Sequence, residues 1–160
     1  DVQSRLLDFD SLWKDPENNL AVSIIATIKN HFRHMRGLVN DHIFALIFGS
    51  CAQVIALRLL LFLKNRSVPF TNDEVVRFVH DVSTMKMFFS EFYATFQETN
   101  SPLGFDPSLV VERLRALLSN EAGSRDVTSD CMVFGLCLCQ SSWQTMDRIC
   151  ELLTHDYDTQ

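Results

Sequence analysis

The stretch that decides the fold covers residues 43–63 and reads IFALIFGSCAQVIALRLLLFL. About 20 apolar residues are enough to cross a bilayer, so its length alone fits a membrane-spanning helix. Two polar residues oppose that assignment. Gln53 lies at the midpoint, and placing Arg58 so near the bilayer centre costs roughly 2–3 kcal/mol. Composition therefore leaves a membrane helix and a soluble core helix in competition.

Wound as a helix, this stretch has two unlike sides. Small or slender residues form one side: Ala45, Gly49, Ala52, Gln53 and Ala56. Bulky residues form the other: Phe44, Ile47, Phe48, Cys51, Val54, Ile55, Leu59 and Phe62. Small residues also serve packing in membranes, but the flanking segments are amphipathic and need an apolar partner. We expect a helix buried nearly all round in a soluble protein, and no transmembrane segment.

Composition sets the class of protein. The chain has 160 residues, 47% of them hydrophobic, and a formal net charge of −6. This length suits one domain and this apolar content supports a core. The acidic balance predicts no nucleic-acid partner. Because the sequence begins with Asp1 and not with Met, we expect residues 1–160 to be a single helical-bundle module cut from a longer protein, and no signal peptide is visible in it.

Seven helical segments follow from apolar periodicity and breakers. They cover about residues 4–13, 18–36, 41–65, 72–98, 107–118, 127–140 and 142–153. The segment 127–140 is ambiguous, since part of it also suits a strand. Short connections make successive helices antiparallel neighbours. The predicted fold is all-α, an up-and-down antiparallel helical bundle or two such bundles end to end.

Local signals mark the expected helix ends. Residues 71–74 (TNDE) and 141–144 (SSWQ) have the spacing of capping boxes. Gly37 stands where a C-cap glycine is expected, and Asn40 where an N-cap is expected. In the segment 72–98 we expect an apolar spine to face inward. The polar residues expected to face away are Arg77, His80, Asp81, Thr84 and Glu91.

No catalytic or cofactor site is predicted. The five glycines are scattered, which excludes a phosphate-binding loop. His31 and His34 are three residues apart, but the helix offers no carboxylate at a matching step, so we expect a solvated polar face. His80 and Asp81 point about 100° apart, which excludes a triad arrangement. We therefore expect no enzyme activity, no cofactor and no metal site.

The cysteines predict neither a metal site nor a disulfide framework. There are five, an odd count without a framework spacing: Cys51, Cys131, Cys137, Cys139 and Cys150. A C-x-C pair without a nearby histidine is poor zinc spacing. We expect reduced thiols that fill the core of a cytosolic protein.

One cluster of charge stands out in this acidic chain. Positive or titratable side chains gather at the end of the second segment: Lys29, His31, Arg33, His34 and Arg36. They either complement the helix C-terminal dipole or contact an anion, on a partner's acidic surface or a phosphoinositide headgroup. Lys29, Arg33 and Arg36 are the candidate contact residues, which leaves weak peripheral membrane contact open. Arg58 either extends to solvent or pairs with Asp81 or Glu91.

One arrangement of segments resembles a known family. LWKDP (12–16) precedes IIATIKNHF (24–32), LLLFLKN (59–65), DV (81–82) and FFSEF (88–92). This order is similar to the C-terminal part of exocyst subunits of the Sec-six type (exocyst complex component three). The resemblance covers about residues 12–98, and no motif in it is diagnostic alone.

The resemblance implies that residues 1–160 are the C-terminal fragment of the protein and form part of an elongated rod of stacked helical bundles. Such rods tether secretory vesicles to the plasma membrane before fusion. It implies other exocyst-type subunits and SNARE proteins as partners, a cytoplasmic location peripheral to the plasma membrane, and no catalytic residues. An alternative is a Bcl-2-like bundle that binds an amphipathic helix in an apolar groove. The residues SWQTM (142–146) resemble its tryptophan-bearing segment, but its Asn-Trp-Gly-Arg motif is absent.

Overall fold

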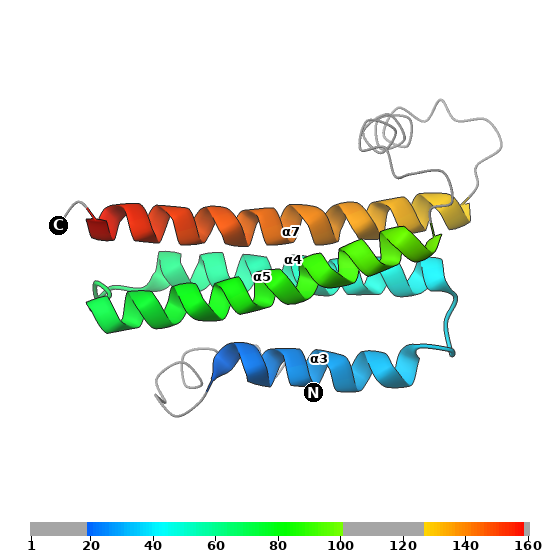
Figure 1. The fold of residues 1–160 in the computed structure, drawn as a ribbon, viewed down its shortest axis with the longest axis horizontal. Coiled ribbons are helices and arrows are strands. Elements are labelled where there is room, and N and C mark those ends of the chain that lie inside the picture. The colour runs from blue at the N-terminus through cyan, green and yellow to red at the C-terminus, as the bar shows by residue number, and fades with distance from the viewer. Residues whose placement is uncertain (1–18, 101–126, 159–160) are drawn as a thin grey trace.

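The computed structural model describes residues 19–100 and 127–158. These residues form four helices and no strand: α3 (Leu20–Met35), α4 (Asp41–Asn65), α5 (Asn72–Asn100) and α7 (Val127–Asp158). Successive helices run in opposite directions (Figure 1). The prediction of an all-α, up-and-down antiparallel bundle is confirmed. The helices expected at residues 4–13 and 107–118 lie outside the described residues.

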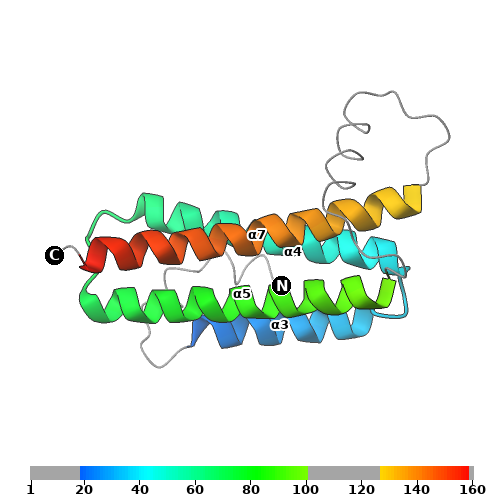
Figure 2. The ribbon, with the colours of Figure 1, turned by 45° about the horizontal axis from the view of Figure 1, so that its top comes forward.

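The helices form three levels. α4 and α5 lie at the same level, with α7 packed over the space between them and α3 on the opposite side, against α5 (Figures 1 and 2). The most extensive packing joins α4 to α7, which run in the same direction, and α5 also packs on α7. The closest helix pair is therefore formed by segments far apart in the sequence.

Capping signals place most of the helix ends correctly. The Thr71 N–H donates to Glu74 Oε2 at 2.9 Å, and the Glu74 N–H donates to Thr71 Oγ1 at 3.4 Å, as a capping box requires. Gly37 has a φ of 100° and follows the last residues of α3. Asn40 stands at the N-cap position of α4, but its side chain makes no capping hydrogen bond.

The capping box predicted at residues 141–144 is wrong. α7 continues without a break from Val127 to Asp158, so the segments expected at 127–140 and 142–153 are one helix. The Ser141 and Ser142 hydroxyls donate to the Leu138 carbonyl at 3.2 and 2.5 Å. Serine hydroxyls that bond back to the preceding turn are compatible with a helix interior, and no proline or glycine stands at this point to end it.

The side of α4 that carries the small residues meets the backbone of α7. A Cβ added to Gly49 would lie 2.8 Å from the Gly135 carbonyl carbon and 3.0 Å from its Cα. A Cβ added to Gly135 would lie 2.5 Å from the backbone nitrogen of Leu46. Neither position has room for a side chain. The prediction that this side of α4 admits another backbone is confirmed, and α7 supplies that backbone.

The side of α4 that carries the bulky residues contributes Phe48 to the centre of an aromatic cluster. Its ring stacks on Phe92 at a centroid distance of 3.5 Å and meets Phe32 and Phe89 edge-on at 5.2 and 5.4 Å. Edge-to-face and stacked rings are favourable beyond the area they bury. Phe32 comes from α3 and the other two from α5, so this cluster joins three helices.

The prediction that α4 is buried nearly all round is wrong. By length and composition α4 could cross a membrane, and 33% of its most apolar window is buried within the protein. Val54, Leu57 and Leu61 are 45%, 52% and 46% exposed. The neighbouring helices cover the small side and part of the bulky side, and no described helix covers the third side. The absence of a transmembrane segment stays a prediction, in accord with the packed glycine and aromatic faces.

The contact between Gly49 and Gly135 generates a test with an unusual sign. At an open helix position, Gly→Ala stabilises by about 1 kcal/mol through helix propensity. Here we expect Gly49→Ala and Gly135→Ala each to lower the free energy of unfolding by about 1–3 kcal/mol, since the added methyl forces the two backbones apart. Gly49→Leu will be more severe. Urea denaturation measures the effect.

The matched control is Ser141→Ala, an exposed change on the same helix as Gly135. It should alter the free energy of unfolding by less than about 0.5 kcal/mol. A gain in stability in either glycine variant would show that the two backbones are not in close contact.

Candidate interaction surfaces

Two of the three cations singled out from the sequence lie on α3, and the third, Arg36, directly follows its last residue. Lys29, Arg33 and Arg36 are spaced four and three residues apart, and all three side chains are exposed. We call this row the basic stripe. The Lys29 Nζ lies 5.6 Å from the centroid of the Phe88 ring on α5, a cation–π contact that holds one end of the stripe against the bundle.

The basic stripe has no carboxylate partner among the ion pairs of the described residues. Those ion pairs join Arg66 to Glu74, Lys86 to Asp147 and Arg148 to Glu151. The stripe therefore presents fixed positive charge to solvent on a chain whose net charge is −6. The nearby histidines do not extend it as a site: the ring of His34 bonds through Nδ1 to the Asn30 carbonyl at 2.7 Å, within its own helix.

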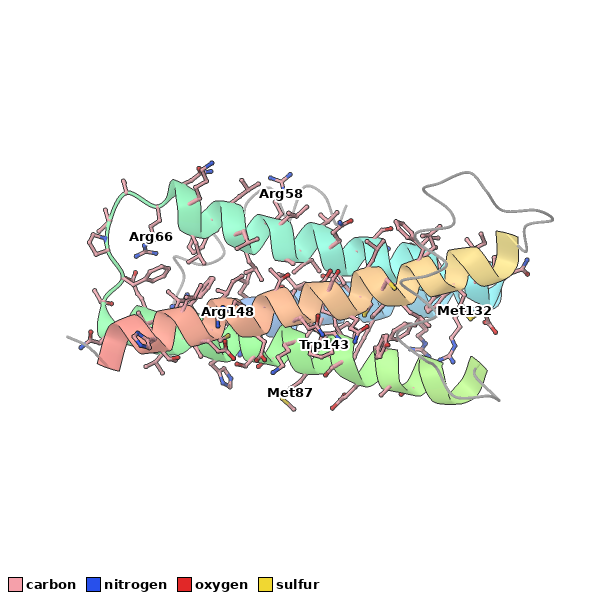
Figure 3. The ribbon with its side chains drawn as sticks, turned by 90° about the horizontal axis from the view of Figure 1, so that it is seen from above. Arg58, Arg66, Met87, Met132, Trp143 and Arg148 are labelled. Atoms are coloured by element: carbon pink, nitrogen blue, oxygen red, sulfur yellow. The ribbon has the colours of Figure 1, made fainter. Side chains whose placement is uncertain are left out.

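The second surface is the uncovered side of α4. Its exposed aliphatic residues are Val54, Leu57, Leu60 and Leu61, and we call them the α4 aliphatic face. Arg58 lies beside them and extends away from the other helices (Figure 3). Of the two orientations expected for Arg58, the outward one is observed. An exposed apolar patch of this kind marks an interaction site in many soluble proteins.

Asp81 is the buried acid of the described chain. It was expected to face solvent, and that prediction is wrong: its exposed fraction is 3%. It accepts a hydrogen bond from the backbone N–H of Ala21, in the first turn of α3, while its Oδ2 has no partner among the described residues. Burial raises the pKa of Asp81, and the nearby Arg77 and His80 oppose that rise. A carboxylate at a helix N-terminus also meets the positive end of its dipole.

The described cysteines are buried or half-buried free thiols. Burial raises the pKa of Cys51 to about 11 and that of Cys139 to about 12. Both thiols are therefore protonated at neutral pH and poorly nucleophilic. The Cys139 Sγ donates to the Phe89 carbonyl at 3.4 Å, which ties α7 to α5. Cys139 lies in the core and Cys51 and Cys150 pack against it, as predicted, whereas Cys137 does not belong to this cluster. The side chain of Cys131 lies outside the described set.

Side chains capable of holding a metal do not gather in the described part of the chain: no group of three or more His, Cys, Asp or Glu residues comes together there. His31 and His34 are exposed on α3. His80 is exposed while Asp81 is buried, so these neighbours on α5 point into different surroundings. Among the described residues, the features that stand out are the basic stripe and the α4 aliphatic face.

Comparison with models of known protein families, with curated proteins and with solved structures finds no match. The described part of the chain is an all-α bundle that exposes a basic row on one helix and an aliphatic face on another.

Sequence reasoning found the basic stripe but missed the α4 aliphatic face and the buried Asp81. The aliphatic face has a signal in the sequence, because α4 is apolar on every side whereas a bundle of four helices covers only part of each helix. The sequence gives a weaker signal for the burial of Asp81. Asp81 follows His80 and precedes Val82 in the apolar spine, so a small rotation of α5 is enough to bury it.

The raised pKa of Asp81 predicts a pH dependence with a definite sign. The folded protein holds this proton more tightly than the unfolded chain, so the contribution of Asp81 to stability is most favourable below its ordinary range. It declines as pH rises through the raised folded pKa. We therefore expect Asp81→Asn to raise the melting temperature at pH 7 and to leave it nearly unchanged near pH 3.

Thermal unfolding followed by circular dichroism across this pH range checks the prediction. Glu91→Gln, at an exposed site on the same helix, is the control and should alter the profile little. If Asp81→Asn melts lower than the unmodified protein at pH 7, the carboxylate's interaction with α3 outweighs its burial.

Proposed function

We propose that the chain is a non-catalytic protein-interaction module of an exocyst-type vesicle-tethering complex. In this role it binds other tethering subunits and SNARE proteins in the cytoplasm, peripherally at the plasma membrane. It acts in exocytosis as one bundle of a longer helical rod.

The order of segments that resembles Sec-six subunits supports this proposal through the core. Among the residues that carry the resemblance, Ile28, Leu59 and Phe89 are fully buried. Asp81 and Val82 are buried beside them. The resemblance therefore bears on how the bundle is built, and the choice of partner has to come from the surface.

The observation that carries the proposal is the α4 aliphatic face. A bundle with a packed glycine contact and a closed aromatic cluster still leaves Val54, Leu57 and Leu61 in water. Exposed leucines on an otherwise well-packed helix are typical of a surface that another protein covers. The basic stripe adds a second, polar contact suited to an acidic partner.

An elongated shape is also consistent with a tethering role. α7 has 32 residues. At 1.5 Å per residue its length is about 48 Å, longer than most helices of compact domains. Long antiparallel helices can stack end to end into a rod, and we propose this arrangement for the full protein.

Affinity capture from cell extract with the 160-residue chain, followed by mass spectrometry, tests the proposal. We expect tethering subunits and SNARE proteins among the captured proteins. Combined Lys29→Glu, Arg33→Glu and Arg36→Glu should reduce their recovery about tenfold, since reversing three exposed charges turns attraction to an acidic surface into repulsion.

The melting temperature of the triple variant should stay within about 3 °C of the unmodified protein, because exposed substitutions affect stability little. Arg148→Glu, a single exposed reversal on α7, controls for the effect of a charge reversal away from the stripe. Recovery that does not change in the triple variant would reduce the stripe to a helix-dipole effect. Capture without any tethering subunit or SNARE protein would reject the proposed function, and capture of one short helical peptide would favour the Bcl-2-like alternative.

A further inference from the structure

The uncovered side of α4 has a regular spacing as well as apolar character. Its outward positions alternate four and three residues apart, the heptad spacing of helices that pack side by side. These positions are Ile43, Ile47, Ser50, Val54, Leu57, Leu61 and Lys64, which we call the α4 seam. The first three are half-buried and the last four exposed, so the C-terminal half of the seam is open.

The same helix carries a different set of residues toward its own bundle. Phe48, Ala52, Ile55 and Leu59 are fully buried, none more than 2% exposed. The α4 seam lies between these buried positions in the sequence and on another side of the helix. α4 thus has one face built for its own bundle and another with the spacing of a helix-pairing surface.

The charged residues that α4 itself carries beside the seam are all of one sign. After Asp41, at its N-terminus, α4 has no acidic residue, and its charged side chains are Arg58 and Lys64, both exposed. Arg58 flanks Leu57 and Leu61, where flanking charges of paired helices select the partner. The complement to this surface is an apolar seam bordered by carboxylates.

A lipid surface fits these features less well. Helices that lie in a membrane interface present a broad apolar face with bulky anchors such as Trp and Phe. The exposed side of α4 carries aliphatic residues, while Phe44 and Phe48 are buried in the bundle. A second copy of the chain fits less well too, since it would bring another Arg58 with no acidic residue nearby on α4 to pair with it.

We propose that the α4 seam docks an acidic amphipathic helix of a partner protein. The partner's apolar residues, at heptad spacing, pack on Val54, Leu57 and Leu61, and its carboxylates pair with Arg58 and Lys64. This inference deepens the proposed function by naming the partner's chemistry, and it rests on that function only for the partner's identity.

A designed peptide tests the chemistry without any knowledge of the natural partner. The probe is a peptide of about three heptads with Leu at the seam positions and Glu at the flanking positions, where Glu repulsion also limits self-pairing. The control peptide has Lys in place of Glu. By isothermal titration calorimetry on the whole chain, we expect the Glu peptide to bind at least about tenfold more tightly, equivalent to about 1.4 kcal/mol.

Variants of the chain locate the binding. Combined Leu57→Asp and Leu61→Asp should weaken the Glu peptide at least about tenfold, whereas Met87→Asp should not. Met87 is exposed on α5 at the opposite edge of the molecule from Arg58 (Figure 3). Arg58→Glu should weaken the Glu peptide and improve the Lys peptide, a reversal that a loss of folding would not produce.

Four results would overturn the proposal. They are equal binding of both peptides, binding unchanged in the double Asp variant, co-sedimentation with phosphatidylserine vesicles in place of peptide binding, and a dimer that the double Asp variant abolishes. A further result would also overturn the proposal: the unmodified chain binds neither peptide, and the double Asp variant has a lower melting temperature. The seam would then be covered by a segment of the same chain.

The two proposals fail separately. If the Glu peptide binds at the α4 seam but affinity capture yields no tethering subunit or SNARE protein, the seam stands and the exocyst role falls. If those proteins are captured equally by the unmodified chain and the double Asp variant, and no peptide binds, the role stands and the seam falls.

Discussion

The contact between the backbones of Gly49 and Gly135 determines how the helices are arranged. Because neither residue has a side chain, α4 and α7 approach closely along a line where any larger residue would separate them. On another side of α4, the rings around Phe48 set the spacing to α3 and α5. With two sides of α4 packed in this way, the described helices leave the third side uncovered, and the candidate surface follows from the packing.

The helices and the two-sided character of α4 could be predicted from residues 43–63, since small and bulky residues separate at helical periodicity. The partner of the small side could not, because nothing local in Gly49 points to Gly135 in a distant segment. The break predicted at Ser141 fails for a related reason: a serine hydroxyl satisfies a helix interior as readily as an N-cap. Asp81 is buried beside the first turn of α3, and the sequence around Asp81 does not show this contact between distant segments.

One of the two candidate surfaces could be predicted from the sequence, and the other could not. The basic stripe is visible in the sequence because Lys29, Arg33 and Arg36 repeat at helical steps in an acidic chain. The α4 aliphatic face is hidden in the sequence by its own hydrophobicity, which reads as core throughout. Only the positions of the neighbouring helices show which apolar residues of α4 are covered. A binding module that relies on such a helix keeps its folding face and its contact face on one segment.

The pairing of α4 with α7 has a consequence for synthesis. A growing chain completes α4 well before α7 leaves the ribosome, so the glycine side and the outer leucines of α4 are both bare for that interval. Contacts between distant segments also slow the search for the native state. Nascent chains with exposed apolar helices bind chaperones or aggregate. The helix that gives the mature bundle its closest fit is therefore the point at which a newly made chain is most vulnerable.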